Sequence, residues 1–159
     1  MARQLVISQM NVRHWFTNKS GVIQSIKKDD PDIILINEHG CSNLHNIKIF
    51  GYKTHQNNYS NGKNDGVAIA IKNNIKYKLI RNNMLSTETI AAKIQTVRGD
   101  LIIGTTYSPP RRIIFPIQDH DTLLTYNLPA YCIGDYNAHH GLLEDNLVNN
   151  KRTRPNESY

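Results

Sequence analysis

The chain has 159 residues, 39% of them hydrophobic, and a formal net charge of +6. This length suits one domain with a core, and no apolar run reaches the roughly 18 residues of a membrane-spanning helix. The N-terminal stretch MARQLVISQMN lacks the long hydrophobic segment of a secretory signal, so we expect an intracellular protein with no membrane partner. The basic charge favours a polyanionic partner, nucleic acid first; the alternative is that it only keeps the protein soluble.

The first part of the chain predicts a strand–helix–strand unit. A strand is expected from Gln4 to Met10, followed by a helix that Thr17 or Asn18 caps and Pro31 ends. The next stretch, DIILINE, contains a continuous apolar run of strand length and ends in a carboxylate. A helix between two strands, the second of them wholly apolar, is typical of a buried parallel pair.

The rest of the chain predicts short strands separated by turn residues. A weak helix is expected over 118–127 and a last strand over 130–137, while the prolines of 109–116 interrupt the sheet. We therefore expect an α/β (α+β) fold, in which a meander of antiparallel strands completes a two-sheet β-sandwich flanked by helices. The domain is predicted over 1–146 and a disordered polar tail over 147–159. The predicted middle strands are 50–58, 66–74, 75–83, 89–97 and 101–107.

The two cysteines, Cys41 and Cys132, lie far apart in the sequence. This spacing argues for a reducing compartment and against a disulfide scaffold. Because Cys132 lies within an apolar run, we expect it to be a core residue.

Polar side chains follow four of the predicted strands. Asn11 follows LVISQM, Glu38 follows IILIN, Tyr107 follows LIIGTT, and Asp135 and Asn137 follow AYCIG. Sites in α/β sheets form where strands release polar residues at one edge, and Mg²⁺ is often held by one or two carboxylates with water and phosphate oxygens. The pattern favours a cation and phosphate site.

Each of these residues also has a structural interpretation. Taken alone, Glu38 is also explained as a solvated carboxylate at a strand end, and Asn11 as a residue that satisfies a turn. In the structural interpretation, Tyr107 is a packing residue with its hydroxyl at the surface, and Asp135 and Asn137 form an Asx-type turn. Turn chemistry does not explain why all five residues follow apolar strands.

Basic and imidazole side chains flank these positions. His139 and His140 are potential zinc ligands. A zinc site is nevertheless disfavoured, because neighbouring histidines in a strand point apart and no other Cys or His has ligand spacing. We expect them to shape their loop or approach the DNA backbone. Arg111 and Arg112 follow a proline pair, where a phosphate contact and a solvated face are alternatives.

The order of motifs resembles the endonuclease/exonuclease/phosphatase superfamily, and within it the apurinic-like endonuclease domain of non-LTR retrotransposon reverse transcriptases. The resemblance covers roughly residues 4–150 and is carried by N-x-R, PDIILINE, DGVAIAI, TTYSPP and GDYNAHH. It implies a Mg²⁺-dependent DNA endonuclease, with Mn²⁺ as a substitute ion, that hydrolyses a phosphodiester and nicks its target. It also implies a reverse transcriptase domain in the full-length parent protein and a nuclear location.

The resemblance assigns a role to each strand-end residue. Glu38 resembles the metal-binding glutamate, and Asn11 resembles the asparagine that supports the same metal. Tyr107 resembles the tyrosine that contacts the scissile phosphate. Asp135 resembles the aspartate that orients or activates the attacking water, and Asn137 its partner in holding the phosphate. A cation and hydrogen-bond donors would stabilise the charge of the transition state.

One motif of the superfamily has no counterpart in this sequence. Members continue beyond GD-x-N-A-H-H to a serine-aspartate-histidine motif, so we expect a domain incomplete on its C-terminal side. Loss of a positioned acid or base typically lowers the rate about 10²–10⁴-fold. Two alternatives therefore stand beside the endonuclease: a non-catalytic remnant with at most weak DNA binding, and a phosphoesterase of the same superfamily.

Overall fold

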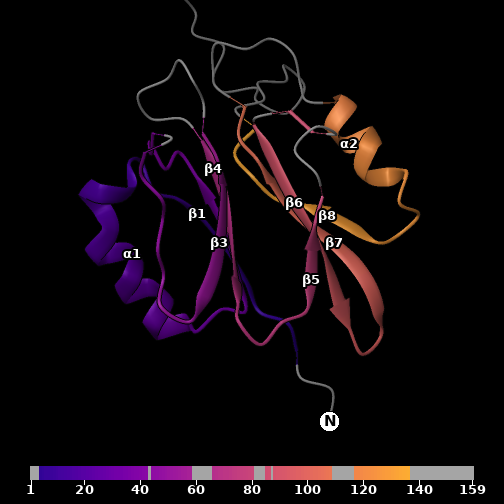
Figure 1. The fold of residues 1–159 in the computed structure, drawn as a ribbon, viewed down its shortest axis with the longest axis horizontal. Helices are drawn as coiled ribbons and strands as arrows, with labels where there is room; N and C mark the ends of the chain where they lie inside the picture. The colour runs from indigo at the N-terminus through magenta and orange to yellow at the C-terminus, as the bar shows by residue number, and fades with distance from the viewer. Residues whose placement is uncertain are drawn as a thin grey trace, which may run out of the picture.

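The protein folds into two facing β-sheets, each covered on its outer side by one helix (Figure 1). The computed structural model describes residues 4–42, 44–58, 66–80, 85–86, 88–108 and 117–136. Within these ranges no helix is long and apolar enough to span a membrane. The predicted two-sheet sandwich flanked by helices is confirmed.

The first sheet contains the predicted strand–helix–strand unit. Strands β1 (Ile7–Asn11) and β2 (Ile33–Asn37) pair in parallel and are joined by helix α1 (Trp15–Asp29). Strand β4 (Val67–Lys72) pairs antiparallel with β2, and β3 (Tyr52–Asn57) pairs antiparallel with β4. The order β1-β2-β4-β3 leaves β1 and β3 at the two edges.

Helix α1 begins earlier than the sequence predicted. It starts at Trp15, and the residue before it, His14, makes no side-chain capping bond. Main-chain bonds explain the early start, because the Trp15 N–H donates to the His39 carbonyl at 2.8 Å and ties this turn to the end of β2. The predicted caps Thr17 and Asn18 were therefore wrong and lie inside the helix.

The second sheet ends in a second parallel pair. Strands β5 (Tyr77–Leu79), β6 (Thr89–Thr96) and β7 (Gly99–Thr106) form an antiparallel meander, as predicted. Strand β8 (Ala130–Cys132) pairs parallel with β7 and is reached through helix α2 (Ile117–Leu124). The predicted antiparallel meander was wrong at β8. Helix α2 carries the chain back along the sheet, so β8 runs in the same direction as β7.

Strand β2 is buried on both faces. Ile33 and Leu35 face the second sheet, while Ile34 and Ile36 pack with Trp15 of α1. Because side chains alternate along a strand, each face of β2 lies against a different layer. A third cluster lies under α2, where Cys132 packs at its margin; Cys41 is buried beside α1, and neither cysteine forms a disulfide.

Candidate functional site

Three of the predicted residues meet where the parallel strands end. The Nδ2 amide of Asn11, at the end of β1, donates to Glu38 Oε1 at 2.6 Å and to Asp135 Oδ2 at 3.3 Å. Glu38 follows β2 and Asp135 follows β8, so the cluster joins the two sheets. Parallel pairing explains this meeting, because it brings the carboxyl ends of neighbouring strands to the same edge. We call Asn11, Glu38 and Asp135 the strand-end cluster.

The backbone around Glu38 is strained. Glu38 has φ of 54°, and Arg13 and His14 in the adjoining loop have φ of 43° and 87°, all in the left-handed region that non-glycine residues rarely adopt. Main-chain bonds hold the two loops together: the Val12 N–H donates to the Asn37 carbonyl at 3.0 Å and the His14 N–H to the Glu38 carbonyl at 2.8 Å. Strain of this kind concentrates at functional sites, where the surrounding structure maintains it.

Asp135 is positioned by the main chain of β7. It forms a parallel bridge with Tyr107, and its carbonyl accepts a hydrogen bond from the Ser108 N–H at 2.9 Å. A Cβ atom on Gly134 would overlap the Thr106 carbonyl oxygen. The apolar strand therefore ends in glycine because only glycine lets the chain approach β7 closely enough to place Asp135 beside Asn11.

Tyr107 lies next to the strand-end cluster but in a different environment. It is only 6% exposed and packs in the cluster of hydrophobic residues between the sheets. Its N–H donates to the Glu88 carbonyl at 3.0 Å, which ties the end of β7 to the residue before β6. The structure thus places Tyr107 beside Asp135 through its backbone.

A buried amide beneath the cluster was missed by the sequence analysis. Asn37 is fully buried and accepts a hydrogen bond from Gln9 Nε2 at 2.7 Å. Its own Nδ2 donates to Thr105 Oγ1 and to the Thr106 carbonyl, both at 3.1 Å, and so crosses from β2 to β7. An amide that closes an otherwise apolar strand was the available signal, because a buried amide needs partners.

His39 is a second residue that the sequence analysis missed. It is fully buried; its Nδ1 accepts from the Cys41 N–H at 3.0 Å, which leaves the ring hydrogen on Nε2 to donate to the Asn57 carbonyl at 3.1 Å. Burial lowers the pKa of His39, so the ring is held neutral. Its fit depends on Gly66, where a Cβ atom would come within 2.5 Å of the ring. His39 therefore fixes the segment that follows Glu38.

The strand-end cluster offers oxygen ligands suited to a hard cation. Glu38 and Asp135 are half-exposed and Asn11 is exposed, which leaves room for water and phosphate oxygens around one or two carboxylates, as Mg²⁺ prefers. The Asn11 amide oxygen accepts from the Arg13 N–H at 3.2 Å, so in this arrangement Asn11 holds the carboxylates through its nitrogen. In the described part of the chain, no three His, Cys, Asp or Glu residues are grouped as a metal site.

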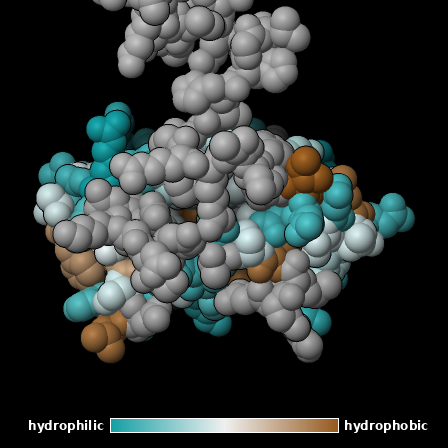
Figure 2. Space-filling model, turned by 90° about the horizontal axis from the view of Figure 1, so that it is seen from above, coloured by the Kyte–Doolittle hydropathy of each residue, from teal (hydrophilic) through white to brown (hydrophobic). Residues whose placement is uncertain are grey.

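The other predicted site residues fall outside the described residues. These are Arg111, Arg112, Asn137, His139 and His140, together with the predicted tail over 147–159. Figure 2 looks onto the end of the sandwich where β1 and β2 stop, and the coloured surface there mixes hydrophilic with hydrophobic side chains.

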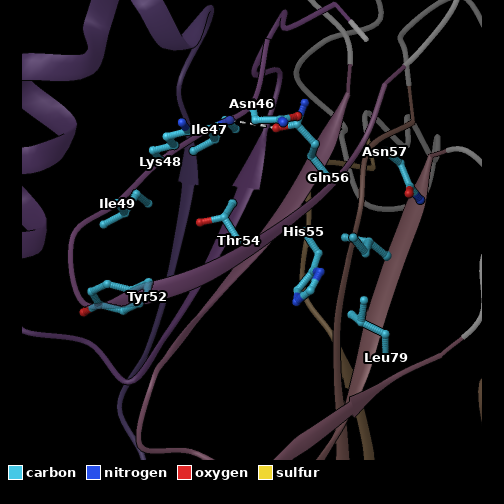
Figure 3. A pocket seen from close by; sticks show the side chains of 11 residues that line it. Asn46, Ile47, Lys48, Ile49, Tyr52, Thr54, His55, Gln56, Asn57 and Leu79 are labelled. Atoms are coloured by element: carbon cyan, nitrogen blue, oxygen red, sulfur yellow. Dashed lines mark hydrogen bonds between the residues drawn. The ribbon is translucent and has the colours of Figure 1, made fainter. Parts of the chain in front are cut away.

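Another hollow lies along the free edge of β3 (Figure 3). It has a volume of about 500 Å³ and is bounded by β3 and the segment from Asn46 to Ile49. Thr54 and His55 project to opposite sides of β3, and the Thr54 hydroxyl is buried with no hydrogen-bond partner among the described residues. None of the strand-end cluster lines this hollow.

Comparison with known proteins identifies the same fold. The model of the Endonuclease/Exonuclease/phosphatase family matches residues 8–155. The "Probable RNA-directed DNA polymerase from transposon X-element" of Drosophila melanogaster is 28% identical over 120 residues, which cover 74% of this chain and 13% of that protein.

Two solved structures are also similar. The endonuclease domain of TRAS1, a telomere-specific non-LTR retrotransposon, matches with a TM-score of 0.61 and 15% identity, over 82% of this chain and 59% of that one. An AP endonuclease from Archaeoglobus fulgidus matches with a TM-score of 0.55 and 18% identity, over 89% and 63%. The chain spans less than two thirds of the length of each of these relatives. The resemblance inferred from its motifs is confirmed, and the chain belongs to the Endonuclease/Exonuclease/phosphatase family.

Proposed function

We propose that this chain is the endonuclease domain of a non-LTR retrotransposon protein and that it nicks DNA with the help of a divalent cation, Mg²⁺ or Mn²⁺. The observation that carries the proposal is the meeting of two carboxylates, Glu38 and Asp135, on one amide at the end of both sheets. Similarity to a transposon polymerase and to the TRAS1 endonuclease domain supports this choice within the family.

The proposed mechanism divides the work among the strand-end residues. Glu38 would anchor the cation, which when bound supplies positive charge to the phosphate oxygens. Asp135 orients the attacking water and takes its proton, while Asn11 keeps the two carboxylates at their separation through its Nδ2 bonds. We assign Tyr107 and Asn137 to the phosphate on the resemblance of their motifs.

The biological setting follows from the same relatives. We propose DNA as the partner, a reverse transcriptase domain in the parent protein, and a nuclear site of action. The net charge of +6 supports a polyanionic partner, because lysine and arginine gain affinity by releasing counterions from phosphates.

Nicking of supercoiled plasmid in Mg²⁺ or Mn²⁺ tests the proposal. Glu38→Gln should abolish nicking, because the amide cannot anchor the cation by charge, and Asp135→Asn should slow nicking about 10²–10⁴-fold. Asp29→Asn is the matched control: Asp29 is exposed at the end of α1, so this variant should nick like the parent chain. Undiminished nicking by Glu38→Gln would refute the role of that carboxylate.

The same assay separates the two alternatives. Salt-sensitive DNA binding without nicking in either cation would contradict the endonuclease and support a non-catalytic remnant. Hydrolysis of a small phosphoester such as p-nitrophenyl phosphate, without nicking, would instead support a phosphoesterase.

A further inference from the structure

A small aromatic pocket adjoins the strand-end cluster. It has a volume of about 310 Å³ and lies between the start of α1 and the loop after β2. The Phe16 ring lies 6.4 Å from the His14 ring and 5.5 Å from the His45 ring, the latter in an edge-on arrangement. We call this the Phe16 pocket; it is lined by His14, Phe16, Gly40, Ser42 and His45.

The pocket shares its backbone with the strand-end cluster. The His14 N–H donates to the Glu38 carbonyl at 2.8 Å, and Gly40 lies two residues beyond Glu38. The strained backbone of Arg13 and His14 is the segment that presents these rings. A ligand held at the strand-end cluster would therefore have its neighbouring groups next to the pocket.

The lining combines an apolar ring face with hydrogen-bond donors. Phe16 is 50% exposed although it is a large hydrophobic residue. His14 Nδ1 lies 3.2 Å from Thr17 Oγ1, and His45 Nδ1 lies 2.8 Å from Ser42 Oγ. A hydroxyl that donates to Nδ1 leaves the imidazole hydrogen on Nε2, and neither Nε2 has a hydrogen-bond partner in the described part of the chain.

This combination matches a nucleobase. Bases stack on aromatic side chains through their π-faces, and their edges carry carbonyl and ring-nitrogen acceptors for N–H donors. A purely aliphatic ligand would leave the Nε2 atoms of both imidazoles without a hydrogen-bond partner, which disfavours it. A pocket of this size and lining accepts one planar heteroaromatic group.

We propose that the Phe16 pocket holds one unstacked base of the DNA strand being cut, next to the scissile phosphate. The proposal rests on the proposed endonuclease function, because that function places the phosphate at Glu38 and Asp135. An enzyme that reads an unstacked base gains selectivity from the sequences that unstack most easily. The pocket would then contribute to the choice of target site.

Binding measurements without cleavage test this proposal. Two fluorescein-labelled 12-nucleotide probes are titrated in CaCl₂: a single-stranded DNA and a base-free tetrahydrofuran oligomer with the same phosphates. The parent chain should bind the DNA about tenfold more tightly than the base-free probe, since stacking of one base contributes roughly five- to 150-fold. Phe16→Leu should reduce that preference to near one while its affinity for the base-free probe stays the same.

Phe50→Leu is the matched control, because Phe50 is fully exposed in the turn before β3 and does not line the pocket. It should keep the parent's preference for bases. His45→Asn, a second variant on the loop opposite α1, should lower the preference about threefold. The proposal would be overturned if the parent chain and Phe16→Leu had the same preference for the DNA over the base-free probe. It would also be overturned if Phe16→Leu and Phe50→Leu lost this preference equally.

The outcome is distinct from that of the nicking assay. If the parent chain fails to nick but its base preference depends on Phe16, base binding by the pocket stands, while the endonuclease proposal and the placement of the base beside a scissile phosphate fall. If the parent chain nicks and Phe16→Leu keeps the base preference, the endonuclease stands and the pocket proposal falls.

Discussion

The two parallel crossovers of this fold, β1–α1–β2 and β7–α2–β8, deliver carboxylates to the same place by different means. In the first, a buried side chain adds to the main-chain bonds at the strand end: Asn37 bonds to Gln9 and across the sandwich to β7. In the second, main-chain contacts hold it: Asp135 bridges Tyr107, and its carbonyl accepts from Ser108. The first therefore depends on a polar side chain, and the second depends on close approach of two backbones.

The strands themselves explain this difference. β2 is buried along its whole length, so its apolar side chains secure it and one amide is enough to join the sheets. β8 has only three residues and lies at the edge of its sheet, so its placement depends on the few bonds after it. We therefore expect substitutions in the two crossovers to change stability and nicking activity to different extents.

The largest effect is expected from Asn37→Leu. The substitution leaves the Thr105 hydroxyl and the Thr106 carbonyl without their buried partner, which we expect to lower the free energy of unfolding by about 3 kcal/mol. Urea denaturation measures this loss. Asn74→Ala, at an exposed turn position, should change the stability by less than about 0.5 kcal/mol, and equal effects of the two variants would contradict the role of Asn37.

A smaller loss of stability with a disproportionate loss of function is expected from Gly134→Ala. The added Cβ must push the chain away from Thr106, at a cost of about 1–3 kcal/mol, and it moves Asp135 away from Asn11. Nicking activity and urea denaturation should be measured together. Gly21→Ala is the control, since nothing lies near that position in α1 and the helix should gain up to about 1 kcal/mol. Full activity in Gly134→Ala would show that Asp135 does not need this close approach.

The smallest effect concerns the opposite flank of the sandwich, where His55 Nε2 lies 2.6 Å from the Tyr77 hydroxyl and links β3 to β5. Burial, with a smaller contribution from Lys53, lowers the pKa of His55 below its ordinary value of 6.5. The unfolded chain then binds the proton more readily, so the stability that His55 contributes is present above pH 6.5 and is lost as the pH falls through the lowered pKa. His55→Gln should lose less stability between pH 7 and pH 5 than the parent chain in thermal denaturation. Parallel pH profiles would contradict this assignment.

Hydrophobic periodicity and turn residues predicted the elements of the fold that depend on neighbouring residues in the sequence. The apolar run of β2, the strand–helix–strand unit and the meander of β5 to β7 follow from burial and turn chemistry. The resemblance of ordered motifs added the roles that we propose for Glu38 and Asp135. The polar residues after the strands predicted a site at one edge of the sheets, and Asn11, Glu38 and Asp135 do meet there.

Contacts between distant segments were not predictable in the same way. The early start of α1 depends on bonds to the loop after β2, and the parallel pairing of β8 depends on where α2 lies. Nothing in the local sequence distinguishes His39 from other residues that follow a strand. Its role depends on its contacts with Gly66 and Asn57, which lie far along the chain. Each of these features depends on partners far along the chain, which hydrophobic periodicity does not identify.

We propose above that Glu38, which Asn11 holds beside Asp135, anchors a divalent cation, and direct Mn²⁺ binding tests this without requiring turnover. Electron paramagnetic resonance of free Mn²⁺ should show one bound ion in the parent chain and in Asp29→Asn. Glu38→Gln should bind it at least about tenfold more weakly, and Asn11→Leu, which removes the amide that holds both carboxylates, about 10–100-fold more weakly. Equal Mn²⁺ affinity in the parent chain, Glu38→Gln and Asn11→Leu would contradict this role of Glu38.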